Sequence, residues 1–154
     1  MPDLDAEIKL KSVSDLLIDE DGSPARYWIP AYQRGYRWKE SQVIQLLDDI
    51  WDFIQNYGNE GSGSFYCLQP LVVCKRPDGS YEVVDGQQRL TTIFILLTYR
   101  QDILNIIGKQ RYAIDFETRD PSFLADIDLD RADENVDFHH ICEAWKAIDA
   151  WCRG

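Results

Sequence analysis

The chain has 154 residues, 45% of them hydrophobic, which suits one globular domain with a hydrophobic core. Its formal net charge is −11 at pH 7, which excludes broad electrostatic binding to nucleic acid or to an anionic membrane, so any anion site must be local. The sequence shows no leader pattern and no apolar run of membrane-spanning length, and a cytoplasmic location is therefore expected.

The four cysteines give no sign of a metal site. No CxxC pair occurs, and no histidine stands at metal-ligand spacing from a cysteine. We expect reduced, partly buried thiols at Cys67, Cys74, Cys142 and Cys152. The adjacent His139 and His140 lack a third ligand or a partner nucleophile, so we expect them at the surface or at the edge of the core.

The N-terminal segment predicts short elements separated by a turn. Apolar residues within 8–17 indicate a short strand that leads into a helical turn capped by Ser12 or Ser14. Residues 19–24 are rich in acidic residues, glycine and proline and predict a turn. The aromatic and apolar segment 26–29 then predicts a strand.

An amphipathic helix and a β-hairpin are predicted next. Apolar residues recur at helical spacing from residue 40 to about residue 57, and a flexible loop is expected at 58–64. The segment 65–75 resembles a strand interrupted by a bulge at its proline. A strong turn signal at 77–80 joins the end of this segment to the strand 81–84, so the two strands should form a hairpin.

Aromatic and guanidinium groups alternate in the segment Ile29-Pro-Ala-Tyr-Gln-Arg-Gly-Tyr-Arg-Trp38, which is too irregular for a strand. Such a loop is suited to stacking on a base and to gripping phosphate. The alternative is that the aromatic side chains are core and the arginines are solvated or paired with carboxylates. We interpret Tyr32 and Trp38 as core residues. We interpret Arg34 and Arg37 as binding residues, because the neighbouring glycine and proline favour a rigid, exposed turn.

The segment Tyr81-Glu-Val-Val-Asp-Gly-Gln-Gln-Arg-Leu-Thr-Thr92 predicts a strand, a turn at Asp85-Gly86 and a helix. The first N–H groups of a helix have no intrahelical partner and the helix dipole is positive there, so the turn favours a bound anion. A capping box formed by Asp85 and Gln88 is the alternative explanation. That alternative leaves Gln87, Arg89 and two threonines unexplained, and we favour the anion-binding interpretation.

The C-terminal half predicts helices around one strand. The helix that begins near Gln87 should continue over 87–107 and end at Gly108, and residues 111–117 should form a strand. Asp120 and the following proline should start a short helix. Asp137 should cap a last helix that carries two tryptophans, and because no element follows it we expect the natural protein to continue.

These motifs carry a resemblance to a known family. The segments 29–38 and 85–92, with the later segments 116–120 and 136–151, resemble the N-terminal domain family of GmrSD-type modification-dependent restriction endonucleases. More distantly, 68–73 with 81–89 is similar to the ParB and sulfiredoxin fold, in which the equivalent turn binds nucleotide phosphates.

The resemblance implies an α+β fold, a small mixed sheet with packed helices. A ParB-like nucleotide-binding core would cover 1–110 and a strand and helical extension would cover 111–154. It also implies a regulatory domain that binds and hydrolyses a nucleoside triphosphate in prokaryotic defence against modified foreign DNA. Members usually carry a separate C-terminal HNH-type nuclease domain, so nuclease activity is not expected from this segment alone.

Each motif residue has an expected role in such a site. Asp85 would place Mg²⁺ or a water, while Gln87 and Gln88 would orient the nucleophile. The expected phosphate-binding residues are Gln33, Arg34, Arg37, Gly86, Arg89, Thr91 and Thr92. Arg34 and Arg89 are expected to converge on one pocket. A DNA-binding sensor without catalytic activity and a purely structural domain remain as alternatives.

Overall fold

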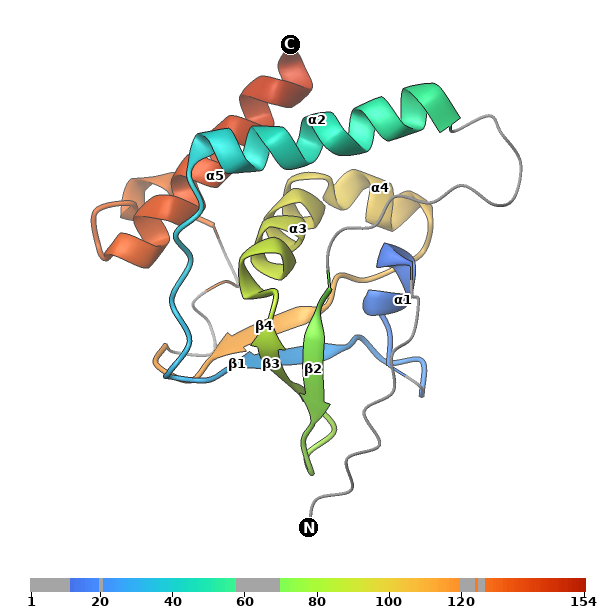
Figure 1. The fold of residues 1–154 in the computed structure, drawn as a ribbon, viewed down its shortest axis with the longest axis vertical. Helices are drawn as coiled ribbons and strands as arrows, with labels where there is room; N and C mark the ends of the chain where they lie inside the picture. The colour runs from blue at the N-terminus through green and yellow to red at the C-terminus, as the bar shows by residue number, and fades with distance from the viewer. Residues whose placement is uncertain (1–11, 20, 58–69, 120–123, 125–126) are drawn as a thin grey trace.

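The computed structural model describes residues 12–19, 21–57, 70–119, 124 and 127–154. Within these residues a four-stranded sheet forms one layer, and the helices lie on one side of it, with α3 next to the sheet and α2 and α5 beyond α3 (Figure 1). The elements in chain order are α1 (Val13–Leu16), β1 (Arg26–Ile29), α2 (Glu40–Tyr57), β2 (Val72–Lys75), β3 (Tyr81–Asp85), α3 (Gln87–Tyr99), α4 (Gln101–Ile106), β4 (Ala113–Phe116), a 3₁₀ turn η1 (Leu129–Arg131) and α5 (Val136–Arg153).

The sheet is mixed, with strand order β2-β3-β1-β4. β1 pairs parallel with both β3 and β4, whereas β2 pairs antiparallel with β3. The hairpin turns at Gly79, whose φ of 88° lies in the left-handed region that glycine enters without strain. The predicted α+β fold with a mixed sheet and a β2–β3 hairpin is confirmed. Because β4 comes from the segment 111–154, the sheet is continuous across the domain boundary predicted at residue 110.

The hydrophobic core lies between the sheet and the helices. Alternate residues of β1 and β4 point into it, and residues 90–95 of α3 are all buried. The inner face of α5 completes it with Phe138, Ile141 and Ile148. The α3 helix is therefore held rigidly by the core, and the backbone and side chains at its N-terminus are held in place with it.

The predicted helix 87–107 is two helices, which corrects the single-helix prediction. Arg100, at φ −105° and ψ 41°, interrupts the backbone between α3 and α4. The predicted end at Gly108 is confirmed: its φ is 68°, and the Lys109 N–H donates to the Leu104 carbonyl at 2.9 Å. Together with the Gly108 N–H bond to the Asn105 carbonyl at 3.3 Å, this satisfies two carbonyl groups that a helix end leaves open.

The sequence predicted a cap for α1 and a cap for α5, and the first is confirmed while the second is two residues away from its predicted place. Ser12 caps α1, since its Oγ accepts from the Asp15 N–H at 3.1 Å and its own N–H donates to Asp15 Oδ2 at 3.2 Å. The cap of α5 is Asn135 rather than Asp137, which corrects the prediction. Asn135 has an extended backbone, and its Oδ1 accepts from the Phe138 N–H at 2.7 Å.

Some expectations fall outside the described residues. These are the strand within 8–10, the loop 58–64, the first part of the strand-like segment 65–75, and the start of the short helix at 120–121. Among the residues that the structure does describe, no helix is both long enough and apolar enough to cross a membrane.

Candidate functional site

The predicted strand–turn–helix at Asp85 is present. β3 ends at Asp85, Gly86 has φ 95° and ψ 11°, and α3 begins at Gln87. A Cβ at position 86 would lie 3.1 Å from Leu71 Cδ1 and 3.2 Å from the Pro70 carbonyl oxygen, so the turn requires glycine for space as well as for its backbone angles.

The capping-box alternative is wrong for this turn. The residue that caps α3 is Gly86, and no side chain caps the helix. Asp85 ends the strand one residue too early to act as the cap. The N-terminus of α3 therefore lacks the side-chain acceptor that usually occupies such a position.

Two glutamine side chains dock the loop 30–39 onto this turn. Gln88 accepts the Arg37 N–H at 2.8 Å and donates to the Gly35 carbonyl at 3.0 Å. Gln33 donates to the Val84 carbonyl at 2.8 Å, at the end of β3. The two motifs that are far apart in sequence are thus one structural unit, and the amide of Gln88 is occupied by the loop backbone.

Tyr36 is the aromatic anchor of the loop. Only 1% of it is exposed, and its Oη lies 2.9 Å from Thr92 Oγ1. Tyr32, which was predicted to be core, is 71% exposed, because it lies in the tight turn where the Gln33 N–H donates to the Pro30 carbonyl. The core prediction for Tyr32 is therefore wrong, whereas Trp38 is partly buried against the core as expected.

Thr91 and Thr92 are part of the core rather than of an open surface. Each is 1% exposed, and each hydroxyl donates to a backbone carbonyl one turn earlier in α3, that of Gln87 at 2.7 Å and that of Gln88 at 2.8 Å. Thr92 also contacts Tyr36, so both threonines have structural partners. The structure does not bring them to the cleft described next.

A polar cleft of about 440 Å³ lies between the loop, the start of α2, the N-terminus of α3 and the start of α5. The residues that line it are Arg34, Arg37, Trp38, Lys39, Gln42, Gln87, Gln88 and His140. Arg34 and Lys39 are exposed, and neither makes an ion pair with a carboxylate of a described residue. The cleft is therefore a local positive site in an otherwise acidic chain.

Asp137 joins the loop to α5 through two ion pairs. Its Oδ1 pairs with Nη1 of Arg37, and its Oδ2 pairs with Nη2 of Arg119 at 2.9 Å. Burial raises the pKa of Asp137, but the hydrogen bonds and charges of both arginines outweigh burial and hold the pKa below its usual value. Arg37 therefore lines the cleft with its charge already partly balanced.

Neither Asp137 nor His140 was predicted as a site residue. Asp137 was predicted to cap α5, and no local pattern distinguishes it within the acidic segment 115–137. His140 was expected at the surface, where it is, but only the packing of α5 shows that it faces the cleft.

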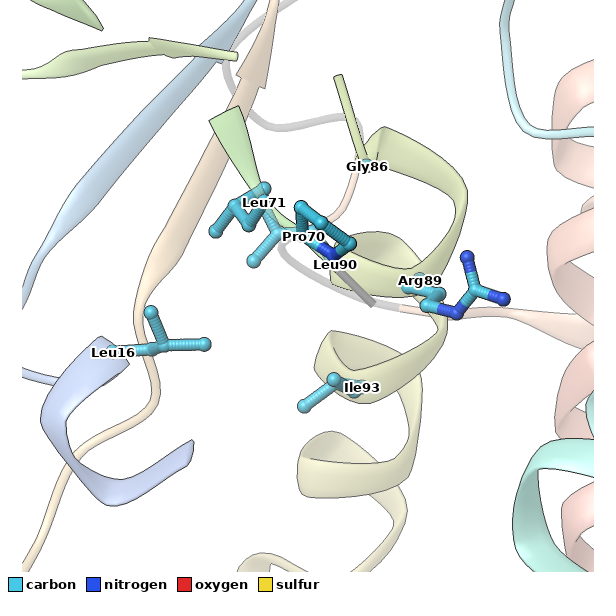
Figure 2. A pocket seen from close by; sticks show the side chains of 7 residues that line it. All are labelled: Leu16, Pro70, Leu71, Gly86, Arg89, Leu90 and Ile93. Carbon is cyan, nitrogen blue, oxygen red and sulfur yellow. The ribbon is translucent and has the colours of Figure 1, made fainter. Parts of the chain in front are cut away.

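Arg89 and Arg34 line different pockets, so the prediction that the two arginines converge on one pocket is wrong. The Arg89 side chain lines a small apolar pocket of about 50 Å³ beside Pro70 and Leu71, while its guanidinium group points away from that pocket (Figure 2). The guanidinium carbon lies 5.4 Å from the centre of the Trp38 ring. Because successive helical residues point about 100° apart, Gln87 and Gln88 face the cleft while Arg89 does not.

Asp85 is exposed at the end of β3 and does not line the cleft. The described residues include no group of three or more His, Cys, Asp or Glu side chains that could hold a metal ion. A single carboxylate fits only a Mg²⁺ ion whose other ligands are phosphate oxygens and waters.

These features define the class of protein: it is an α+β domain with a mixed sheet and a basic cleft where a strand, a turn and a helix meet. The family described as "GmrSD restriction endonuclease, N-terminal domain" matches residues 13–148, and the chain belongs to it. It is accordingly a protein of a restriction system. No match was found among curated proteins or among solved structures.

Proposed function

We propose that the cleft binds the phosphate groups of a nucleoside triphosphate, and that the chain is a nucleotide-binding and nucleotide-hydrolysing regulatory domain of a restriction protein that acts on modified DNA. The observation that carries this proposal is the pair Arg34 and Lys39. Both side chains line one cleft, and neither makes an ion pair with a carboxylate of a described residue, although the chain has a net charge of −11. Unbalanced cations in an acidic protein favour an anionic ligand.

The size and lining of the cleft support this ligand class. Its volume of about 440 Å³ lies within the range of about 300–1,000 Å³ that is usual for small-molecule sites. Trp38 offers an aromatic surface to a base or sugar, and the N-terminus of α3 contributes N–H groups and the positive end of the helix dipole. Positioned positive groups of this kind stabilise the charge that develops in phosphoryl transfer.

Gln87 and Gln88 have different roles in the proposed reaction. Gln88 holds the loop backbone, so its amide is engaged before any ligand binds. Gln87 lines the same cleft, and its side chain makes no hydrogen bond to another described residue, so it is the one that can orient a water nucleophile. Asp85, which is exposed at the end of β3 and does not line the cleft, would hold Mg²⁺ through its carboxylate, and the cation would supply neutralisation of phosphate charge.

One observation favours a second function, a DNA-binding sensor. Tyr32 is 71% exposed beside Arg34, and an exposed aromatic ring next to a guanidinium group is suited to a base and its phosphate. This function would use the outer side of the loop and need no chemistry. Membership of a restriction endonuclease family supports DNA as the partner of such a sensor, and we propose that the DNA is a duplex with modified bases.

Calorimetric titration tests the nucleotide proposal. Nucleoside triphosphates are titrated, with and without Mg²⁺, into wild type, Arg34→Ala and Lys39→Ala. Loss of one charge-assisted contact of about 1.5–3 kcal/mol should weaken binding roughly ten- to hundredfold. Arg153→Ala, an exposed arginine on the far end of α5, is the matched control and should bind like wild type.

Two further variants test the role of Arg89 and the binding of Mg²⁺ separately from phosphate binding in the cleft. Arg89→Ala should cost less than Arg34→Ala, because Arg89 does not line the cleft. Asp85→Asn should spare binding without Mg²⁺ and remove its enhancement by Mg²⁺, because the amide lacks the charge that holds the cation. If no triphosphate binds wild type in either condition, the nucleotide proposal is wrong.

A further inference from the structure

We propose that His140 is a phosphate-binding residue of this cleft that acts in its protonated form, so that binding of a polyphosphate takes up a proton. This inference rests on the proposed function and adds a group from α5 to a site otherwise built by the loop, α2 and α3. It also means that binding of a proton to His140 and binding of the anion are thermodynamically linked.

The placement of His140 is fixed by its neighbours on α5. Phe138 and Ile141 on either side of it are fully buried, so a rotation of the helix about its axis would expose both side chains to water. Asp137 lies one turn before His140 on the same helical face and is held to the loop by Arg37. His140 is therefore presented to the cleft, whereas the adjacent His139 is exposed.

The charges around His140 come from two elements. The loop supplies Arg34, Arg37 and Lys39, which line the same cleft, and α5 supplies Asp137 and the ring of His139, whose centre lies 5.4 Å away. Burial lowers the pKa of His140, and His139, Arg37 and Lys39 lower it further against the opposing effect of Asp137. In the free protein the imidazole is thus neutral at neutral pH.

A bound polyphosphate reverses this balance. Several negative charges placed among the loop cations would favour the imidazolium form and raise the pKa of His140 by about 1–3 units. The bound state then holds more protons than the free state, so affinity rises as pH falls through the window between the two pKa values. One linked proton changes affinity by at most about tenfold per pH unit.

The chain contains two histidines, which makes a direct measurement simple. In His139→Gln, His140 is the single histidine, and its ring-proton resonances report its protonation alone. The pKa of this histidine should rise by about one unit or more when inorganic triphosphate is added at saturating concentration. An unchanged midpoint would overturn the inference, and this result does not depend on whether a His140 variant folds.

Calorimetry of inorganic triphosphate in two buffers of different ionisation enthalpy gives the second measurement, from about pH 5.5 to about pH 7.5. Wild type and His139→Gln should take up more protons than His140→Gln, and the affinity of His140→Gln should change less with pH. Comparison with the same ligand cancels the titration of triphosphate itself. Melting curves confirm that each variant is folded.

The outcomes separate this inference from the function on which it rests. If wild type and His140→Gln bind triphosphate with the same proton uptake, His140 is not a ligand, while the nucleotide proposal stands. If wild type binds triphosphate at no pH, both are overturned. Proton uptake lost in His139→Gln but kept in His140→Gln would assign the effect to the exposed histidine and also overturn the inference.

Discussion

Replacement of Asp137 by Asn should destabilise the fold, because this carboxylate is the link between the loop 30–39, the segment after β4 and α5. Asp137 is 8% exposed and pairs with Arg37 and Arg119. A hydrogen bond between charged groups contributes about 1.5–3 kcal/mol. Side-chain exposures of 31% and 33% let water reach both arginines, so we discount each contribution by roughly half and expect a total loss of about 1.5–3 kcal/mol.

This loss should lower the melting temperature by about 3–12 °C, at about 2–4 °C per kcal/mol for a chain of this size. The pH dependence has a definite sign. Since the folded-state pKa of Asp137 is depressed, its contribution is complete above the unfolded-state pKa of about 3.9 and is lost as pH falls through the folded-state value. The difference between wild type and Asp137→Asn should be constant from neutral pH down to about pH 5 and shrink below about pH 4.

Thermal melts followed by circular dichroism measure both effects. Asp133→Asn, an exposed acidic residue between η1 and α5, is the control and should melt like wild type. Equal melting temperatures of wild type and Asp137→Asn at neutral pH would refute the reasoning, since both ion pairs would then be too weak to matter. A difference that persists unchanged in acid would show that the loss is not electrostatic.

A double-mutant cycle gives an independent check of the same contact. A Cβ at Gly35 would lie 2.6 Å from Asp137 Cγ and 2.7 Å from its Oδ2, so Gly35→Ala should displace the carboxylate from its arginines. The cost of Gly35→Ala should fall markedly in an Asp137→Ala background, which gives a coupling energy of about 0.5–3 kcal/mol. Additive effects would mean that position 35 and Asp137 do not interact.

Three further substitutions test the turn and the loop. Gly86→Ala should cost about 1–3 kcal/mol in urea unfolding, because alanine is strained at φ 95° and its Cβ would crowd Leu71; a wild-type midpoint would contradict this. Tyr36→Phe removes one buried hydrogen bond and should cost about 1 kcal/mol by the same assay, and a stabilised variant would show that the bond is not formed. Gln88→Ala frees the Arg37 N–H, whose hydrogen exchange should become faster; unchanged protection would mean that Gln88 does not hold the loop.

The sequence by itself determined the local elements of this protein. The amphipathic helix 40–57 and the hairpin around Gly79 follow from hydrophobic periodicity and from a glycine at a turn position. The strand, the turn at Gly86 and the following helix also agree with the prediction, since each depends on residues that are neighbours along the chain. Membership of the family was recognisable for the same reason, because its motifs are short and continuous.

Only the tertiary structure decided which motif residues share the cleft. The bond from the Arg37 N–H to Gln88 spans 51 residues of sequence and the ion pair of Arg37 with Asp137 spans 100, and no local pattern encodes either. The same limit applies to Tyr36 rather than Tyr32 as the buried aromatic residue, and to the separation of Arg89 from Arg34. Periodicity specifies which residues prefer burial, but which partner each side chain meets depends on how elements distant in sequence pack together.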